Sequence, residues 1–505
     1  MYQVQWHICE DNTDMKLQWN QIDWKKAEEQ VNRLQIRIVK ATLEQKLRLV
    51  KRLQYLITNS FYAKALAVKR VVSNRGKKTP GIDGEIWKSD KEKVNAVRSL
   101  DCQTYHAKPL KRVYIEKFGK KEKRPLGIPT MRDRAMQALQ LLALEPVAET
   151  TADRISFGFR KYRSPEDARE YAFSVLSRKD SPQWILEGDI KSCFDKISHR
   201  WMMDNIPGNK RIMKEFMRCG YVEKGKLYPT IEGSPQGGVI SPTYANMVLD
   251  GLEPMILDVY WRSKVKRTFS VKYNAHKVHV VRFADDFIVT ASDKETLKEI
   301  KPMIERFLEE RGLRLSEEKT VITHINDGFD FLGWNFRKFK GKLIIKPSHK
   351  SMKKITRKIS EIIKENQTAT QEILIKKINE VTVGWANYHH SSCAKKCFHT
   401  LDHRIWEMLW RWSKRRHPNK NKHWIVNKYW KEHKGRKWTF MSDKNILFLM
   451  MDMPIVRKGQ ISLNKNPFLD REYFECRAKR YRLNRKRSYE FQSSRANGIL
   501  CVIDT

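Results

Sequence analysis

Three aspartates carry the chemistry that this sequence suggests most directly. Asp285 and Asp286 stand side by side in VRFADDFIVT, between apolar runs that predict the two strands of a hairpin, and Asp189 ends the apolar run of WILEGD. Adjacent carboxylates repel each other, so a hairpin tip is an unfavourable place for them unless a cation lowers the repulsion. Mg²⁺ prefers hard oxygen ligands of this kind. The aspartates are therefore either an Asp-rich turn or a site for the two metal ions that nucleotidyl transfer requires.

Residues suited to nucleotide binding accompany the aspartates along the chain. The stretch KFGKKEKRPLGIP contains Lys117 and Arg124 and predicts a basic hairpin suited to a triphosphate. The stretch SPQGGVISPTYANMVLD contains Gln236 in a Gly-rich turn before a helix, where backbone can approach a nucleotide closely. Phe194 lies five positions after the first aspartate, and Lys319 lies in SEEKT. This company favours the metal site over the plain turn.

Apolar spacing predicts the elements that would position these residues. Asp23 is predicted to cap a helix whose apolar face runs from Ala27 to Ala41 at three-four spacing. From about residue 110, RVYIEKFGKKEKRPLGIPT predicts strand, basic turn and strand, and MRDRAMQALQLLALEPVAE predicts a helix. Strands that alternate with helices to about residue 340 predict an α+β domain. Beyond IIKPSHK we expect no strands, and apolar stripes at helical spacing predict three helices between residues 352 and 412.

The composition indicates a nucleic-acid partner. The 505 residues include 100 Lys and Arg against 58 Asp and Glu, which gives a formal charge of +42. A surplus of this size repels itself unless it meets a polyanion. Beyond residue 415, Lys and Arg interleave with Trp and Tyr, as phosphate contact combined with base stacking requires. No apolar run approaches ~18 residues, so we predict no membrane partner.

The sequence also bears on the compartment. The first residues, MYQVQWHICEDNTD, carry acids and lack a basic segment followed by an apolar one, so neither a secretion nor a transit signal is predicted. The 8 cysteines have no framework spacing, which suits reduced thiols. We therefore expect a cytoplasmic, bacterial protein associated with the nucleoid.

The ordered motifs resemble one known family. TPGIDG, RPLGIPT, DRAMQAL, SFGFR, SPQGGVISP, FADD, FLGW and GWANYH follow one another at spacings similar to those of the group II intron-encoded reverse transcriptase/maturases. The resemblance runs from about Trp19 to about Phe474. It implies a right-hand-like polymerase with fingers and an antiparallel palm sheet. An α-helical thumb/maturase bundle and a basic C-terminal DNA-binding region would follow.

The resemblance assigns the catalytic and metal-binding role to one set of residues, which would hold two Mg²⁺ ions, with Mn²⁺ as a substitute: Asp189, Asp285 and Asp286. It also implies that Lys117 and Arg124 grip the triphosphate and that Phe194 lies under the sugar and excludes a 2′-hydroxyl. Gln236 would line the nucleotide site. Lys319 would protonate the leaving pyrophosphate, although the sequence alone fits a solvated loop lysine equally well.

The chain departs from the family pattern in several places. Phe283 stands where the family usually has Tyr before Ala-Asp-Asp, and the basic loop from Lys117 to Arg124 is one residue longer than is common. Many relatives end in an HNH endonuclease with paired CxxC motifs. Here Cys501 stands where a first CxxC would begin, so we expect no working nuclease.

The predicted function is that of an RNA-directed DNA polymerase and maturase. Its partners would be group II intron RNA, an RNA template with a DNA primer, target DNA and dNTPs, and it would assist splicing and target-primed intron mobility. Two alternatives stay open: a non-catalytic RNA-binding splicing factor, and a reverse transcriptase recruited to defence or repair. The intact aspartate triad argues against the splicing factor, and the GWANYH motif argues against the recruited reverse transcriptase.

The resemblance and the patterns together predict five regions: an N-terminal helical RNA-binding domain (1–95), reverse transcriptase fingers and palm (96–340), a thumb/maturase domain (341–415), a basic DNA-binding region (416–495) and the remnant of an endonuclease start (496–505).

Overall fold

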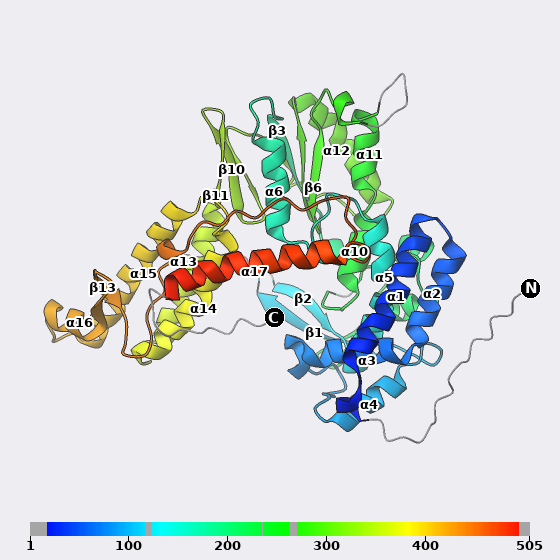
Figure 1. Ribbon diagram of the computed structural model, residues 1–505, viewed down its shortest axis with the longest axis horizontal. Helices are drawn as coiled ribbons and strands as arrows, with labels where there is room; N and C mark the ends of the chain where they lie inside the picture. Colours follow the sequence, from blue (N-terminus) through cyan, green and yellow to red (C-terminus); the bar gives the residue numbers. More distant parts are fainter. Residues whose placement is uncertain (1–17, 117–122, 235, 263–269, 494–505) are drawn as a thin grey trace, which may run out of the picture. The chain divides into compact units, whose positions relative to one another are not determined.

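The computed structural model describes residues 18–116, 123–234, 236–262 and 270–493, the last of these without side chains beyond residue 482 (Figure 1). The chain divides into two compact units, one formed by residues 1–151 and 193–248 and the other by residues 152–192 and 249–505. The predicted combination of helices with antiparallel sheets is confirmed. In the described part, no helix combines the length and the apolar character needed to cross a membrane.

The first unit is mainly helical. Its helices are α1 (Trp24–Leu43), α2 (Leu47–Asn59), α3 (Phe61–Ser73), α4 (Asp90–Ser99), α5 (Met131–Thr151), α7 (Cys193–Lys196), α8 (His199–Asn205), α9 (Lys210–Arg218) and α10 (Ser241–Leu249). Helices α1, α2 and α3 all pack against α5, which is buried along most of its length. As predicted, Asp23 caps α1 by accepting a hydrogen bond from the Lys26 backbone nitrogen at 2.9 Å.

The same unit contains a four-stranded sheet in the order β2-β1-β4-β5. Its strands are β1 (Leu110–Glu116), β2 (Lys123–Ile128), β4 (Tyr221–Glu223) and β5 (Lys226–Tyr228). The first two pair antiparallel, as the predicted basic hairpin requires, and the turn between them lies outside the described residues.

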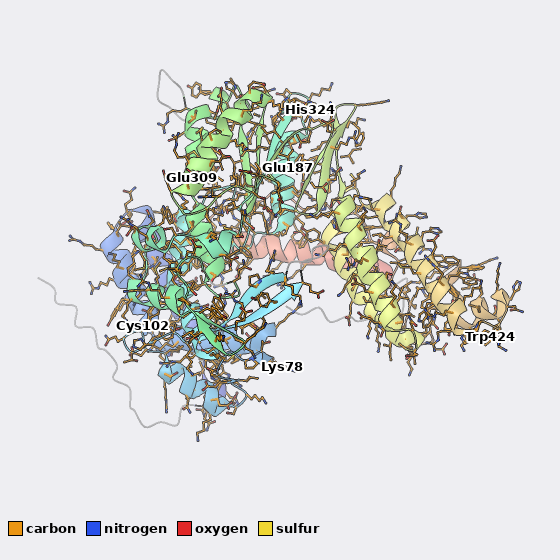
Figure 2. All side chains as sticks on the ribbon, turned by 180° about the vertical axis from the view of Figure 1, so that it is seen from behind. Lys78, Cys102, Glu187, Glu309, His324 and Trp424 are labelled. Carbon is orange, nitrogen blue, oxygen red and sulfur yellow. The ribbon has the colours of Figure 1, made fainter. Side chains whose placement is uncertain are left out.

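The second unit has an antiparallel sheet at its centre, in the order β6-β7-β3-β8. Its strands are β3 (Trp184–Asp189), β6 (His279–Phe283), β7 (Asp286–Ala291) and β8 (Val321–His324). Three further helices accompany it: α6 (Pro165–Leu176), α11 (Leu252–Tyr260) and α12 (Lys294–Glu309). Helix α12 packs on β3 and β7 through its buried apolar face, and α6 packs on β6 (Figure 1). On β3 and β8, Glu187 and Thr323 form a hydrogen bond of 3.0 Å, and Glu187 is labelled in Figure 2.

A small sheet and a helical bundle complete this unit. The sheet has the order β11-β10-β9 and contains β9 (Phe329–Phe331), β10 (Trp334–Phe339) and β11 (Lys342–Pro347). The bundle contains the three predicted helices, α13 (His349–Glu365), α14 (Gln371–His389) and α15 (Lys395–Arg416), followed by α16 (Lys422–Tyr429). Residues after the predicted boundary at 416, from Ile425 to Met453, share the hydrophobic core of these helices.

The expectation that strands cease after IIKPSHK, which ends at Lys350, is wrong. A second hairpin follows α16, with strands β12 (Trp430–His433) and β13 (Arg436–Phe440). Its turn contains Lys434 and Gly435, which both have positive φ, at 54° and 73°. Two consecutive residues with positive φ form the two-residue turn whose twist best matches that of the flanking strands. The Lys-Gly pair within this charged stretch is therefore the sequence signal for the hairpin. The last helix, α17 (Arg471–Ser493), follows an extended segment.

Candidate active site

The two adjacent aspartates lie at the tip of the β6–β7 hairpin. Phe283 pairs with Asp286, which leaves Ala284 and Asp285 as a two-residue turn, and Ala284 has a φ of 56°. On the other side of β7, Asp286 pairs directly with Asp189 at the end of β3. Side chains of directly opposed residues lie about 5 Å apart at Cβ, so the fold gathers the three predicted carboxylates at one end of one sheet.

A loop that the sequence analysis mentioned only as a motif supports this turn. Within SFGFR, the Phe157 backbone nitrogen donates to the Arg282 carbonyl at 2.9 Å, and the Arg282 nitrogen donates to the Ile155 carbonyl at 3.1 Å. Gly158 then passes directly beneath the turn. A Cβ at Gly158 would overlap the Ala284 nitrogen and lie 2.9 Å from the Phe283 carbonyl carbon. Only glycine fits where two backbones approach so closely.

A buried ion pair fixes the base of the hairpin. Arg282 is fully buried, and its guanidinium forms an ion pair with Asp250 and lies 3.9 Å from an Asp153 carboxyl oxygen. Asp153 also accepts hydrogen bonds from the backbone nitrogens of Gly251, at 2.8 Å, and Glu253, at 3.2 Å. No sequence pattern points to these residues, because a single Arg inside an apolar strand gives no sign of which distant acids will pair with it.

Electrostatics at the hairpin tip favour a cation. The carboxyl of Asp286 keeps exposed surface, yet surrounding protein, followed by the charges of Asp285 and Asp189, raises its pKa to about 6. Lys319 and Lys350 oppose this shift. A carboxylate whose ionisation is disfavoured by neighbouring carboxylates gains stability when a cation lowers the local negative charge.

Lys319 lies beside the carboxylates, as the sequence predicted for a residue of the reaction site. Its Nζ is 2.6 Å from Asp189 Oδ2, and the lysine side chain is about half exposed at 53%. The segment before it is held against the end of β3, because the Ser316 nitrogen donates to the Asp189 carbonyl at 2.8 Å. Backbone contacts with the end of β3 therefore set the position of this segment, while the lysine side chain stays about half exposed.

The predicted nucleotide-binding residues of the other unit also converge on one another. Gln236 accepts a hydrogen bond through its backbone carbonyl from the Gly127 nitrogen on β2 at 2.8 Å, and β2 also carries Arg124. The Phe194 carbonyl accepts from the Ser234 nitrogen at 2.6 Å. The backbones of three of the predicted residues are thus linked through β2 and the Gly-rich turn. Lys117 lies outside the described residues.

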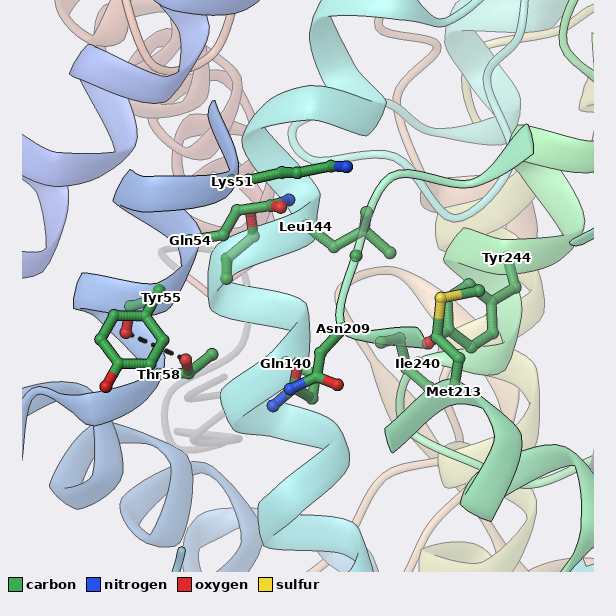
Figure 3. A pocket seen from close by; sticks show the side chains of 12 residues that line it. Lys51, Gln54, Tyr55, Thr58, Gln140, Leu144, Asn209, Met213, Ile240 and Tyr244 are labelled. Carbon is green, nitrogen blue, oxygen red and sulfur yellow. Dashed lines mark hydrogen bonds between the residues drawn. The ribbon is translucent and has the colours of Figure 1, made fainter. Parts of the chain in front are cut away.

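A separate pocket in the same unit contains none of the predicted residues. It encloses about 220 Å³ and is lined by α2, α5 and the start of α9, with Gln54, Tyr55 and Gln140 among its side chains (Figure 3). Gln54 donates hydrogen bonds to the Ala143 and Pro207 carbonyls, at 3.2 and 3.4 Å. This glutamine joins α2, α5 and the loop before α9, so the pocket follows from helix packing.

The carboxylates are chemically suited to bind a metal ion, but their side chains do not form a complete coordination site. Among the described residues, no three His, Cys, Asp or Glu side chains already converge as metal ligands. The hairpin nevertheless presents hard oxygen donors at a point where repulsion raises a carboxyl pKa, which fits a magnesium-type ion. Asp189, Asp285 and Asp286 could therefore hold such ions after rotation of their side chains.

Comparison with known protein families gives three matches. Residues 19–100 match the N-terminal domain of reverse transcriptase, residues 115–336 match reverse transcriptase (RNA-dependent DNA polymerase), and residues 352–430 match the group II intron maturase-specific domain. Together these matches cover most of the described chain.

Individual relatives agree with these matches. The chain is 30% identical over 340 residues to the group II intron-encoded protein LtrA of Lactococcus lactis subsp. cremoris. The similar region covers 56% of each of the two chains. It is 32% identical over 325 residues to protein YkfC of Escherichia coli, covering 56% of this chain and 82% of that protein. It is 24% identical to maturase-like protein 1 of Euglena gracilis over 75% of this chain and 79% of that one. The chain thus spans about half of the length of LtrA.

Proposed function

The chain belongs to the group II intron-encoded reverse transcriptases with a maturase domain, and on this premise we propose that it is an RNA-directed DNA polymerase that also acts as a maturase. The observation that carries the polymerase proposal is the pairing of Asp189 with Asp286, beside Asp285 in a two-residue turn. Three carboxylates at one end of a rigid antiparallel sheet are suited to hold metal ions for nucleotidyl transfer.

In this proposal Asp189, Asp285 and Asp286 hold two Mg²⁺ ions, or Mn²⁺ in their place. When bound, the ions would activate a primer 3′-hydroxyl and stabilise the charge on the triphosphate. Lys319 would protonate the leaving pyrophosphate from its Nζ, which lies beside the carboxylate of Asp189. The buried Arg282 would keep the hairpin base in place throughout.

The nucleotide-binding roles come from the other unit. We propose that Arg124 and Lys117 contact the triphosphate, that the Phe194 ring excludes a 2′-hydroxyl, and that Gln236 lines the nucleotide site. The hydrogen bonds of the Gly-rich turn to Gly127 and to the Phe194 carbonyl support a common role for Arg124, Phe194 and Gln236. We expect synthesis to survive the replacement of the usual tyrosine by Phe283, because the ring is kept and a single hydroxyl is lost.

At the level of architecture, we propose right-hand-like fingers and palm over residues 96–340, with the β6-β7-β3-β8 sheet as the palm sheet. Residues 341–415 would be the thumb and maturase domain, preceded by an N-terminal RNA-binding domain over residues 1–95. Residues 416–495 would hold target DNA. Intron RNA, an RNA template with a DNA primer, target DNA and dNTPs are the proposed partners, and splicing and target-primed mobility are the proposed processes.

Primer extension tests the polymerase proposal. Wild-type protein, with Mg²⁺, dTTP and poly(rA)/oligo(dT), is expected to extend the primer, and Asp285→Ala is expected to abolish extension. Asp327→Ala removes the same charge from an exposed position of the same unit and is expected to retain activity. If Asp285→Ala extends the primer as well as wild type does, the hairpin tip is not the metal site.

The maturase match favours a second candidate, a splicing factor without polymerase activity. In that case neither wild type nor variant would extend the primer, while both would bind structured RNA in a salt-sensitive way. Splicing assays with the intron RNA would then show activity that the Asp285→Ala variant retains.

A further inference from the structure

Three tryptophans of the bundle form one aromatic group, here called the indole cluster: Trp406, Trp410 and Trp438. Trp406 and Trp410 lie one turn apart on α15, with ring planes 4° apart and centroids separated by 5.8 Å. The Trp438 ring, on β13, lies 5.9 Å from the first and 6.5 Å from the second. The hairpin that the sequence analysis did not predict therefore completes the cluster.

The indole cluster extends from the core to the surface. Beneath it, the buried Trp430 ring lies 5.4 Å from Trp410 and 5.2 Å from the buried Phe440. Trp406 and Trp410 are partly exposed, and Trp438 is 52% exposed. Packing of the core explains the buried rings. It does not explain a large indole left half in water at the outer end of the cluster.

The surface around the indole cluster is strongly basic. Between residues 403 and 438 the sequence contains 12 Lys and Arg and 2 acidic residues. One of the acids, Glu407, lies 3.4 Å from His403, and Arg436 is paired with Asp452 at 2.6 Å. The side chains of Lys434 and Lys437 are exposed in the same hairpin as Trp438. The surface combines a flat aromatic face with cations that suit phosphates.

A neighbouring tryptophan shows the same combination. Trp424 on α16 is 36% exposed and is labelled in Figure 2. The Nζ atoms of Lys420 and Lys428 lie 5.4 and 4.8 Å from its ring centroid. Exposed indoles with nearby ammonium groups thus occur at two points of the bundle, which argues for a shared ligand rather than for incomplete packing.

We propose that the indole cluster is a stacking site for an unpaired base of single-stranded RNA, with Trp438 as the outer ring and the surrounding lysines at the phosphates. The proposal rests on the proposed RNA binding of the chain and adds the surface and the kind of RNA element. It assigns RNA to this part of residues 416–495 and leaves the rest of that region for the target DNA proposed above. Every base has an aromatic face, but a duplex hides these faces except at its ends. Looped-out or single-stranded bases are therefore the ligand class that matches this surface.

Photo-cross-linking tests the site in the full-length protein without any substitution. The probe is a 20-nucleotide RNA that contains 4-thiouridine, used single-stranded, annealed to its complement, or replaced by single-stranded DNA with 4-thiothymidine. Trypsin cleaves after Lys437 and Lys444 and so releases Trp438 in the short peptide WTFMSDK. An adduct on this peptide with single-stranded RNA, lost on annealing, is expected. Absence of that adduct, equal labelling by duplex, or preferential labelling by DNA overturns the proposal.

Substitutions provide a quantitative readout. Trp438→Ala is expected to weaken binding of the single-stranded RNA about 5- to 100-fold, as loss of one stacking partner does, and Trp438→Phe to restore most of it. The matched control is Phe339→Ala, because Phe339 is also an exposed aromatic with a cation 4.7 Å from its ring. If the control weakens binding as much as Trp438→Ala does, the loss is not specific to the indole cluster.

The outcome is separable from that of the polymerase proposal. Trp438→Ala should still extend oligo(dT) on poly(rA), and Asp285→Ala should still give the adduct on residues 438–444. A wild-type protein that forms the adduct but does not extend a primer would refute the polymerase and leave the stacking site standing.

Discussion

At the scale of the residue, the candidate site depends on two small residues that carry no reactive group. Ala284 adopts a left-handed backbone conformation, which costs a residue with a Cβ about 1–2 kcal/mol. Gly158 makes this conformation tenable, because it lets the SFGFR loop pass directly beneath the turn. The strain lies immediately before Asp285, in the two-residue turn that carries this aspartate.

We predict that Gly158→Ala abolishes primer extension while the protein stays folded. The added Cβ must displace the Ala284 backbone, and a shift of about 1 Å at a catalytic group is enough to cost ~100-fold in rate. Primer extension and circular dichroism measure the two effects. Gly384→Ala is the control, since a Cβ at Gly384 would have nothing within 4 Å and alanine favours the helix.

Asp402 gives a pH-dependent prediction. Burial on α15 raises the pKa of its carboxyl to about 7, although the carboxyl accepts hydrogen bonds from the backbone nitrogens of Met451 and Met450, at 2.8 and 3.0 Å. A raised carboxyl pKa means that the folded state binds the proton more tightly than the unfolded state does. This contribution to stability is present below pH ~4 and is lost as the pH rises to ~7.

Thermal melts of wild type and Asp402→Asn between pH 5 and pH 8 measure this effect. The amide cannot ionise, so the difference in Tm should move in favour of the variant as the pH rises, by on the order of 1–3 kcal/mol in stability. A Tm difference that stays constant with pH would show that Asp402 has the same pKa in both states.

At the scale of the element, α6 has a second role beside packing on the sheet. Asp167 in its first turn is fully buried and forms ion pairs with Arg477 at 2.6 Å and Lys458 at 3.1 Å. It also completes the capping box with Ser164. The Phe474 ring stacks on Tyr162 with centroids 5.2 Å apart. Part of the basic C-terminal region therefore serves to attach α17 to α6 and to the loop before α6.

We predict that Asp167→Asn destabilises the protein by about 3–5 kcal/mol, because it leaves the largely buried Arg477 without its counter-charge and Lys458 with only Glu166, at 3.9 Å. Urea unfolding measures the loss, and limited proteolysis should cut first between residues 454 and 480. Asp443→Asn breaks an exposed ion pair with Lys431 and should cost no more than about 1 kcal/mol. Equal effects of the two substitutions would mean that Asp167 is no anchor.

At the scale of the whole molecule, the formal charge of +42 would govern the proposed association with RNA. Binding through many phosphates releases counterions, so affinity should fall about 10³- to 10⁵-fold between 50 and 200 mM salt if 6–10 phosphates are contacted. Filter binding or fluorescence anisotropy at several salt concentrations gives the slope of log affinity against log salt concentration.

Trp438→Ala should lower the affinity for RNA without changing this slope, whereas the double variant Lys434→Ala, Lys437→Ala should make the slope shallower. A slope near zero for wild type would contradict electrostatic binding.

The sequence by itself determined the local elements and the chemistry expected at the hairpin tip. Apolar periodicity predicted α1, the three bundle helices and the hairpin, because these patterns reflect which face of an element becomes buried. Adjacent carboxylates between two strands, with a third at another strand end, left a metal site and an Asp-rich turn equally open, and the accompanying motifs favoured the metal site. The predicted roles of Arg124, Phe194, Gln236 and Lys319 came from the resemblance to a family.

Only the tertiary structure decided which distant residues meet. The pairing of Asp189 with Asp286, the contact of Gly158 with Ala284 and the burial of Arg282 between two acids join positions far apart in the chain. No local pattern encodes such contacts, since they arise from packing of one element on another. In the basic C-terminal region, too, the sequence showed which residues are charged and which are tryptophans, but not what they contact. The fold alone separated the cations that anchor α17 from the tryptophans that remain at the surface.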